Sequence, residues 1–157
     1  MNKKAEDFKK YLETKAITCF TVEEIDDDQL NTVVFRSTIE VEGVQLPTII
    51  ILDSSIYGMV RVLIAPSALK ESNELDLLRQ INSTNSKYKV FKYYLGENGE
   101  LYLESCILLP KGKSEGDLIY TVLDVIIKHL QDEYKSLMKL SRSSLPDQLH
   151  KTFILVL

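Results

Sequence analysis

The first third of the chain arranges its apolar and polar residues in two different rhythms. At the start, apolar residues recur at helical spacing among Lys and Glu, at Ala5, Phe8, Leu12 and Ala16. This spacing predicts a short helix with one apolar face. In "TVVFRSTIEVEG", residues 32–43, an extended chain directs Val33, Phe35, Ile39 and Val41 to one side and Arg36, Thr38, Glu40 and Glu42 to the other. A period of two with one polar face is typical of an antiparallel strand, and Gly43 permits a turn after it.

Further strands are predicted on both sides of this one. The segment "AITCFTVEEI", residues 16–25, is rich in β-branched and aromatic residues, and "VQLPTIIILD" and "YGMVRVLIAP" follow the turn. Residues 49–52 are apolar on both faces, which predicts a central strand that is covered on both sides. Pro47 has no donor for a strand ladder, so an edge or a bulge is expected there.

The second half of the chain predicts a helix and then a hairpin. Residues 72–82, "SNELDLLRQIN", have a helical pattern with Ser72 or Asn73 as the N-cap. This helix is expected to end in the polar run "NSTNS", whose side chains compete for backbone hydrogen bonds. Two strand-like segments, "YKVFKYYLG" and "ELYLESCILLP", flank Asn98 and Gly99. An Asn-Gly pair between strands favours a tight hairpin turn.

A long helix over roughly residues 114–140 carries the widest apolar stripe of the chain. The stripe comprises Leu118, Ile119, Val122, Leu123, Val125, Ile126, Ile127, Leu130, Tyr134 and Leu137. Packing on one sheet requires a narrower stripe, so we expect part of it to cover the sheet and part to meet a partner. Together with the preceding helix it supplies a candidate face for self-association or partner binding, made of Leu75, Leu78, Ile81, Ile119, Leu123, Ile126 and Leu130.

The element order predicts the fold class. Helices and strands follow one another as α-β-β-β-(β)-α-β-β-α, without strict alternation, which favours an α+β domain with an antiparallel sheet and flanking helices. We expect one domain over residues 1–140 and a C-terminal tail over residues 141–157. The tail ends in "TFILVL", six residues with strand preference. Because an exposed apolar end is an aggregation hazard, it is predicted to dock on this chain or on a neighbour.

Composition and charge narrow the classes of partner. The chain has 157 residues, 45% hydrophobic and 27% charged, with a net charge of −4. An acidic balance repels phosphate backbones, so no nucleic-acid partner is predicted. The start of the chain has no signal-peptide pattern, and no apolar run is long enough to cross a bilayer, so we predict a cytoplasmic protein without a membrane partner. Cys19 and Cys106 lie far apart without metal or redox spacing, which favours two buried thiols over a disulfide.

A search for catalytic and metal-binding patterns leads to no committed site. Sequence motifs for dinucleotides, phosphates, serine nucleophiles and catalytic zinc do not occur. We predict no metal site at His129 or His150, and a solvated loop at residues 26–28 rather than a cation site. Asp53 and Glu104 are carboxylates that a fold could bring together, but nothing in the sequence selects them. Tyr88, Tyr93 and Tyr94 are read as packing residues rather than a stacking platform. We therefore predict no enzyme and no cofactor.

A resemblance to a known family adds to this picture. The stretch "LLRQINSTNSKYKVFKYYLGENGELYLESCILLP" and the order of elements over residues 3–140 resemble the YbjN family of bacterial sensory transduction regulators. In that family a helix ends in Leu/Ile-Asn, here Ile81 and Asn82, and a hairpin turns at Asp/Asn-Gly, here Asn98 and Gly99. The resemblance implies a fold similar to that of type III secretion chaperones, which are small, acidic and usually dimeric. It implies no catalytic residues.

These observations predict a cytoplasmic, non-enzymatic protein-binding or regulatory module that acts as a chaperone-like homodimer with a protein partner of unspecified identity. The segment "TFILVL" is a candidate internal mimic of that partner, or a strand exchanged with the neighbouring subunit. Two alternatives stay open. One is a small-ligand sensor or an enzyme with an unfamiliar site, which requires a deep polar pocket. The other is a structural subunit of a larger assembly.

Overall fold

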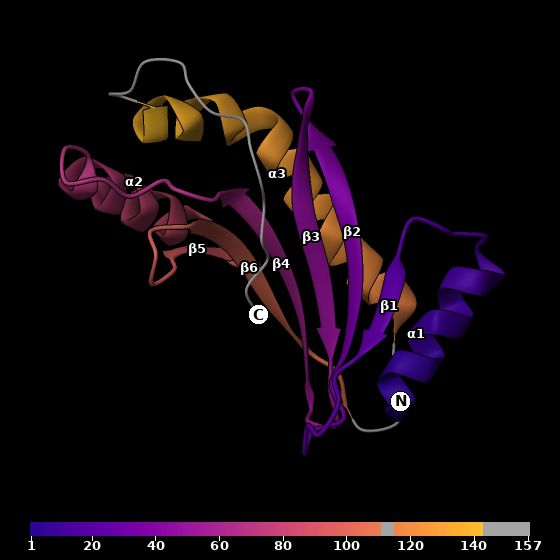
Figure 1. Cartoon of the computed structure of the whole chain (residues 1–157). Helices are drawn as coiled ribbons and strands as arrows, with labels where there is room; N and C mark the ends of the chain where they lie inside the picture. Colours follow the sequence, from indigo (N-terminus) through magenta and orange to yellow (C-terminus); the bar gives the residue numbers. More distant parts are fainter. Residues whose placement is uncertain (111–114, 143–157) are drawn as a thin grey trace.

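The computed structural model describes residues 1–110 and 115–142, which form three helices and one six-stranded antiparallel sheet (Figure 1). The elements in chain order are α1 (Lys3–Thr14), β1 (Thr21–Glu24), β2 (Val33–Val41), β3 (Val44–Leu52), β4 (Tyr57–Ala65), α2 (Glu74–Lys87), β5 (Lys92–Leu95), β6 (Leu101–Leu108) and α3 (Gly116–Arg142). The strands lie in the order β1-β2-β3-β4-β6-β5. The predicted α+β class is confirmed, with four strands before α2.

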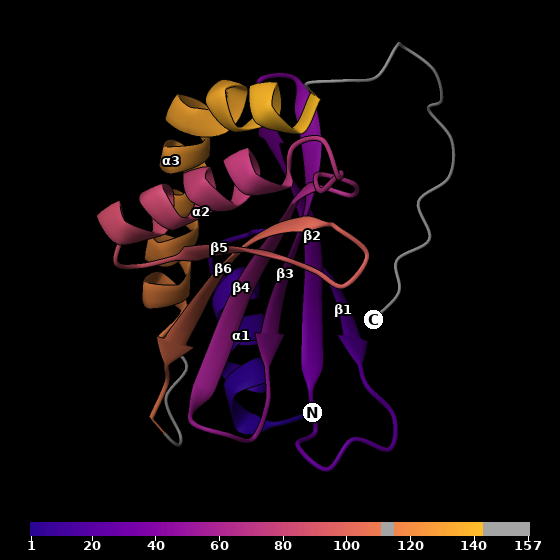
Figure 2. The same cartoon turned by 90° about the vertical axis from the view of Figure 1, so that its left-hand side faces the viewer.

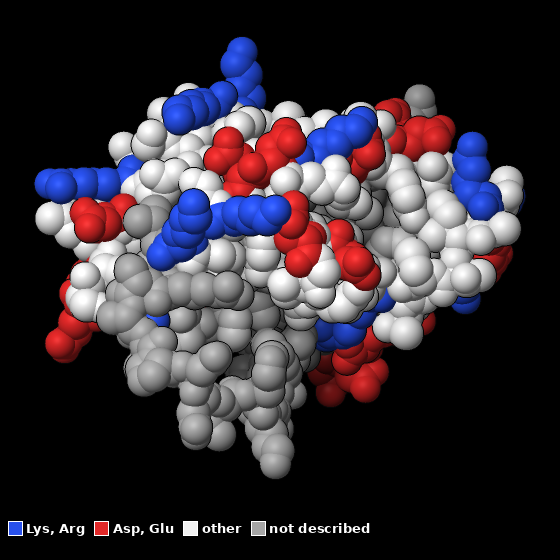
Figure 3. Space-filling view, turned by 90° about the horizontal axis from the view of Figure 1, so that it is seen from above, with Lys and Arg blue, Asp and Glu red and all other residues white. Residues whose placement is uncertain are grey.

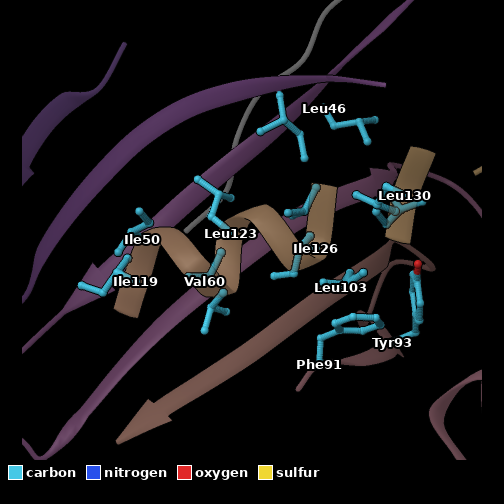
Figure 4. Packing of buried hydrophobic residues seen from close by; sticks show 14 of the residues in the cluster. Leu46, Ile50, Val60, Phe91, Tyr93, Leu103, Ile119, Leu123, Ile126 and Leu130 are labelled. Carbon is cyan, nitrogen blue, oxygen red and sulfur yellow. The ribbon is translucent and has the colours of Figure 1, made fainter. Parts of the chain in front are cut away.

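Helices α1 and α3 pack on one face of the sheet, which we call the covered face, while α2 lies beside β5 and α3 (Figure 2). The core lies between this face and α3. Figure 4 shows Leu123 of α3 beside Ile50 and Val60 of the central strands, and Ile126 beside Leu103 of β6. Full burial of such a side chain contributes about 1.5–3 kcal/mol, so this layer is the main source of stability.

Tight turns join the strands where glycine was expected. Between β2 and β3, Glu42 and Gly43 both have positive φ, 52° and 75°, which matches the right-handed twist of a two-residue hairpin. Gly99 has a φ of 82° in the turn between β5 and β6. A side chain there would also meet the Cβ of Leu69 at 3.1 Å. Both predicted hairpins are present, but the second turns over residues 96–100, and only Gly99 of its Asn-Gly pair has a positive φ. The tight two-residue turn predicted there is therefore wrong.

Asn2 connects the start of α1 to the sheet. Its Oδ1 accepts a hydrogen bond of 3.0 Å from the backbone N–H of Ala5, which caps the helix. Its Nδ2 donates to the backbone carbonyls of Asn31 and Leu52, both at 2.8 Å. The residue is 8% exposed. One small side chain thus satisfies two buried backbone groups and one partly buried one, on three segments.

Helix α2 extends beyond its predicted end, because it includes the run "NSTNS" and continues to Lys87. Thr84 is buried, and the side-chain amide of Asn85 donates to the carbonyl and accepts from the N–H of Tyr93 in β5. The Asn85 side chain thus bonds to the neighbouring strand, while the Ser86 hydroxyl donates to the carbonyl of Ser83 within the helix. Neither bond ends the helix. Among the apolar residues of α2, Leu77 and Ile81 face the core.

The position of Pro47 agrees with its chemistry. Strand β3 is an interior strand, paired with β2 and β4. Its pairing with β4 runs only from Thr48 to Leu52, so Pro47 lies one residue beyond the last pair. The predicted edge character is therefore local, and no ladder donor to β4 is needed at this residue.

Candidate functional site

The face of the sheet opposite α1 and α3 has no helix over it among residues 1–110 and 115–142 (Figure 2). Side chains from five strands point to it. We call this the open face and define it by Val34, Ile49, Ile51, Met59, Arg61, Leu63, Tyr94, Tyr102, Glu104 and Cys106. The register places Ile51 opposite Met59 and Met59 opposite Cys106, so the members of one row share a face.

The centre of the open face is apolar and incompletely buried. Ile50 and Val60 point to the covered face and are 0% exposed, whereas Ile51 and Met59 beside them are only half-buried. The sequence predicts that β3 is central and covered on both faces. The central position of β3 is confirmed. Among the described residues, however, no helix covers its second face. Val34, at the β2 end of this face, is 3% exposed, so its apolar surface consists of the half-buried Ile49, Ile51, Met59 and Leu63. An apolar sheet surface without a helix over it is a candidate interaction site.

A polar and aromatic cluster borders this apolar centre on β4, β5 and β6. The rings of Tyr94 and Tyr102, which face each other across the strands, stack with centroids 5.4 Å apart and planes at 25°. Arg61 lies over the Tyr102 ring at 5.7 Å, and its Nε donates to Glu104 at 2.6 Å. Burial raises the pKa of Tyr94 to about 12, with a smaller contribution from the charge of Glu104. The hydroxyl of Tyr94 therefore keeps its proton at neutral pH and can donate a hydrogen bond. Tyr and Arg are the residue types enriched where partners bind most strongly.

The opposite border of the open face carries unused hydrogen-bonding groups. Arg36 forms an ion pair of 2.7 Å with Glu23, but its Nη1 is buried without a hydrogen-bond partner. Strand β1 pairs only with Val33–Arg36 of β2. The rest of β2, residues 37–41, has no strand beside its outer edge among the described residues. A free strand edge is a template for an additional extended segment.

Charges elsewhere do not separate into regions of one sign. Viewed from above, blue Lys and Arg side chains alternate with red Asp and Glu side chains over the described surface (Figure 3). Asp28, in the acidic loop, accepts a 2.7 Å hydrogen bond from the backbone of Thr32. No group of three or more His, Cys, Asp or Glu side chains that could hold a metal ion occurs in the described part of the chain.

The structure divides the predicted partner face. Ile81, Ile119, Leu123, Ile126 and Leu130 lie in the core and are at most 8% exposed. The wide stripe of α3 is used within the chain, because α1 packs on one side of it and α2 with β5 on the other. Five of the seven residues thus offer no surface to a partner, which corrects that assignment. Leu75 and Leu78 on α2 are exposed, at 60% and 44%.

His129 is a buried packing residue. It is 6% exposed, and its ring lies 4.3 Å from that of Tyr88 and 4.5 Å from that of Phe91 between centroids. Its Nε2 shares a 2.8 Å hydrogen bond with the Tyr93 hydroxyl. Burial lowers the pKa of His129, and the nearby acidic Glu133 opposes this only in part. Tyr88 and Tyr93 are therefore part of this cluster, as packing residues, while His150 lies outside the described residues.

We expect His129 to make the fold acid-sensitive. A histidine whose pKa is lowered on folding takes up its proton more readily in the unfolded chain, so its contribution is complete above the ordinary pKa of 6.5 and is lost as the pH falls below it. Urea denaturation from pH 7.5 to pH 5 should show a smaller decline in unfolding free energy for His129→Phe than for the unmodified chain. Tyr93→Phe, which keeps the imidazole, is the control and should retain the decline. Equal slopes in all three proteins would contradict this role.

The two candidate carboxylates lie apart and bind different cations. Asp53 lies 3.7 Å from Nζ of Lys4, a residue of α1 that is 4% exposed and also donates to the carbonyl of Tyr57. Burial lowers the pKa of Lys4, and Asp53 opposes that effect. Glu104 pairs with Arg61 on the open face. The two acids form no catalytic pair, and each has a structural partner.

Cys19 and Cys106 are both free, as predicted, but the prediction that they are buried is wrong, because both are exposed. Cys106 lies on β6 at a position that alternates with the buried Ser105 and Ile107, so its side chain points to the open face. Cys19 precedes β1 and lies near Tyr120 of α3, whose pKa is raised first by burial and next by this thiol. The thiol of Cys106 thus lies on the open face, whereas that of Cys19 lies near α3.

The chain matches no family model, and no curated protein matches its sequence. No helix of the described residues is both long and apolar enough to cross a membrane. The resemblance to the YbjN family and to secretion chaperones accordingly stays a prediction.

Proposed function

We propose that this protein is a non-enzymatic protein-binding module that holds an apolar segment of a partner on its open face. The observation that supports this most is the apolar row of Ile51 and Met59 on a sheet face that no described helix covers. This is the surface that the predicted chaperone-like function requires. The YbjN-like family assignment and a cytoplasmic location are parts of the same proposal.

The residues around Ile51 and Met59 favour a partner segment in extended conformation. Tyr94, Tyr102 and Arg61 offer aromatic surface and charge at one side. The free edge of residues 37–41 offers backbone hydrogen bonds at the other. Strand addition combines these two features, since the backbone supplies affinity and side-chain contacts supply specificity.

Affinity capture with a matched pair of variants tests this proposal. Met59→Lys places a charge in the centre of the open face, and Val125→Lys places the same charge on the exposed side of α3. From a lysate of the native cell, the unmodified chain and Val125→Lys should recover one protein in near-equal amount, identified by mass spectrometry. Met59→Lys should lose it, while its circular dichroism spectrum stays unchanged. Equal recovery by both variants, or recovery of the bait alone, would contradict the proposal.

The proposal includes a homodimer. Leu75 and Leu78 lie three residues apart on α2 and are the exposed members of the predicted self-association face. Light scattering at micromolar concentration should give twice the chain mass of 18.0 kDa, and Leu75→Glu with Leu78→Glu should give 18.0 kDa. A mass of 18.0 kDa for the unmodified chain would refute self-association.

A further inference from the structure

We infer that the open face is occupied, when no partner is bound, by residues 152–157 of the same chain, the segment "TFILVL". This inference rests on the proposed function of the face and adds its regulation. A partner then has to displace the internal segment before it can bind. The case depends on where α3 ends, on the length of chain that follows, and on the chemistry of the two surfaces.

The end of α3 is held close to the end of a central strand. Nζ of Lys70 donates a 3.0 Å hydrogen bond to the carbonyl of Ser141, in the last turn of α3. Lys70 belongs to the loop that follows β4, and β4 ends at Ala65. Leu63, two residues before that end, faces the open side of the sheet. The chain thus continues from a point that is held by the loop after β4, a strand of the open face.

The remaining chain is long enough to cross the open face. From Arg142 to Lys151 there are ten residues, which in extended form reach roughly 33 Å. A nine-residue strand such as β4 spans about 30 Å. Residues 152–157 can therefore reach any position on the face while α3 stays in place. The linking stretch "SSLPDQLHK" is mostly polar, as a solvated connection requires.

Residues 152–157 can supply the apolar cover and the hydrogen-bond acceptor that the open face lacks. The last five residues, from Phe153 to Leu157, are all apolar, so an extended segment presents apolar side chains on either of its faces. One of these faces can cover Ile51 and Met59. An extended segment also brings carbonyl oxygens, and Arg36 Nη1 is a buried donor that needs such an acceptor. The same contact removes an aggregation-prone end from solvent.

This arrangement supplies the second cover that the sequence of β3 predicts. Ile49 and Ile51 alternate with Ile50 and Leu52, so the strand is apolar on both faces, yet the described helices cover only one. If the segment occupies the open face, a partner can bind only to the fraction of molecules in which that face is free. The apparent dissociation constant of the partner is then its intrinsic value divided by this fraction. A substitution that weakens the binding of residues 152–157 to the open face is thus expected to strengthen partner binding.

The two native cysteines allow a direct test in the full-length chain. A nitroxide spin label on Cys106, in a Cys19→Ser background, lies on the open face. A label on Cys19, in a Cys106→Ser background, lies beside α3 and serves as the matched control. In NMR spectra of the 15N-labelled protein, the Cys106 label should strongly broaden the amide signals of residues 152–157. The Cys19 label should leave them sharp.

Three outcomes would overturn the inference. Sharp signals with the Cys106 label mean that the segment lies elsewhere, and equal broadening by both labels means that it has no fixed place. Broadening that occurs only between 15N-labelled and spin-labelled molecules in a mixed sample means that the segment of a second copy is the occupant. The capture experiment with Met59→Lys is independent, since the face can bind a partner without the internal segment. Conversely, broadening without any captured protein supports the segment and refutes the partner.

Discussion

Replacing Leu130 by alanine should lower the free energy of unfolding by about 2–5 kcal/mol, the range for a large-to-small change in a core. Leu130 is 0% exposed and packs between α3 and the covered face of the sheet (Figure 4). The loss combines the transfer of apolar atoms with the cavity that remains, because the strands beneath cannot fully collapse into it. Urea denaturation followed by circular dichroism measures it.

Val125→Ala is the matched control for this prediction. Val125 is 38% exposed on α3, and a surface change of this kind should alter the unfolding free energy by at most about 0.5 kcal/mol. The two variants compare a buried and an exposed residue of the same helix. If Leu130→Ala were as stable as the unmodified chain and only changed the oligomeric mass, the stripe of α3 would be a partner surface after all.

Replacing Asn2 by alanine should lower the free energy of unfolding by about 2–4 kcal/mol. Loss of the cap contributes about 1 kcal/mol. The buried carbonyl of Leu52 then loses its donor, which costs about 1–3 kcal/mol, whereas the partly buried carbonyl of Asn31 can bond to water instead. Thermal and urea denaturation should agree on the loss.

Two further substitutions identify which contacts of Asn2 matter. Asn2→Asp keeps an oxygen for the N–H of Ala5 but directs a carboxylate at two carbonyl oxygens, so it should be at least as destabilising as alanine. Asn98→Ala removes an exposed asparagine from the β5–β6 turn, where its side chain contacts only Glu100, and should change the stability by at most about 0.5 kcal/mol. A stable Asn2→Asp variant would show that the two carbonyl contacts contribute nothing.

Much of the fold follows from local pattern. The alternation of "TVVFRSTIEVEG" specifies which side chains of β2 face the core, and the period of α3 specifies its buried stripe. Gly43 and Gly99 mark the turns because their positive φ is strained for other residues. These features depend on residues within a few positions of one another, so they can be read without knowledge of the rest of the chain.

Other features depend on contacts between segments that are distant in the sequence. For these features the predictions from sequence alone are wrong. The run "NSTNS" stays helical because Asn85 bonds to Tyr93 of β5. The stripe of α3 contains no free partner face because α1 and α2 use its margins. Cys106 is exposed because its strand has one face without a helix over it.

The candidate site belongs to the second group. The apolar residues of β3 and β4 are visible in the sequence, but their periodicity does not say which of two apolar faces receives the helices. The strand order β1-β2-β3-β4-β6-β5 brings Met59 between Ile51 and Cys106, and Arg61 beside Glu104. Local sequence therefore determined the elements and their apolar sides, whereas only tertiary packing decided which side stays open, because that choice depends on long-range burial by α1 and α3.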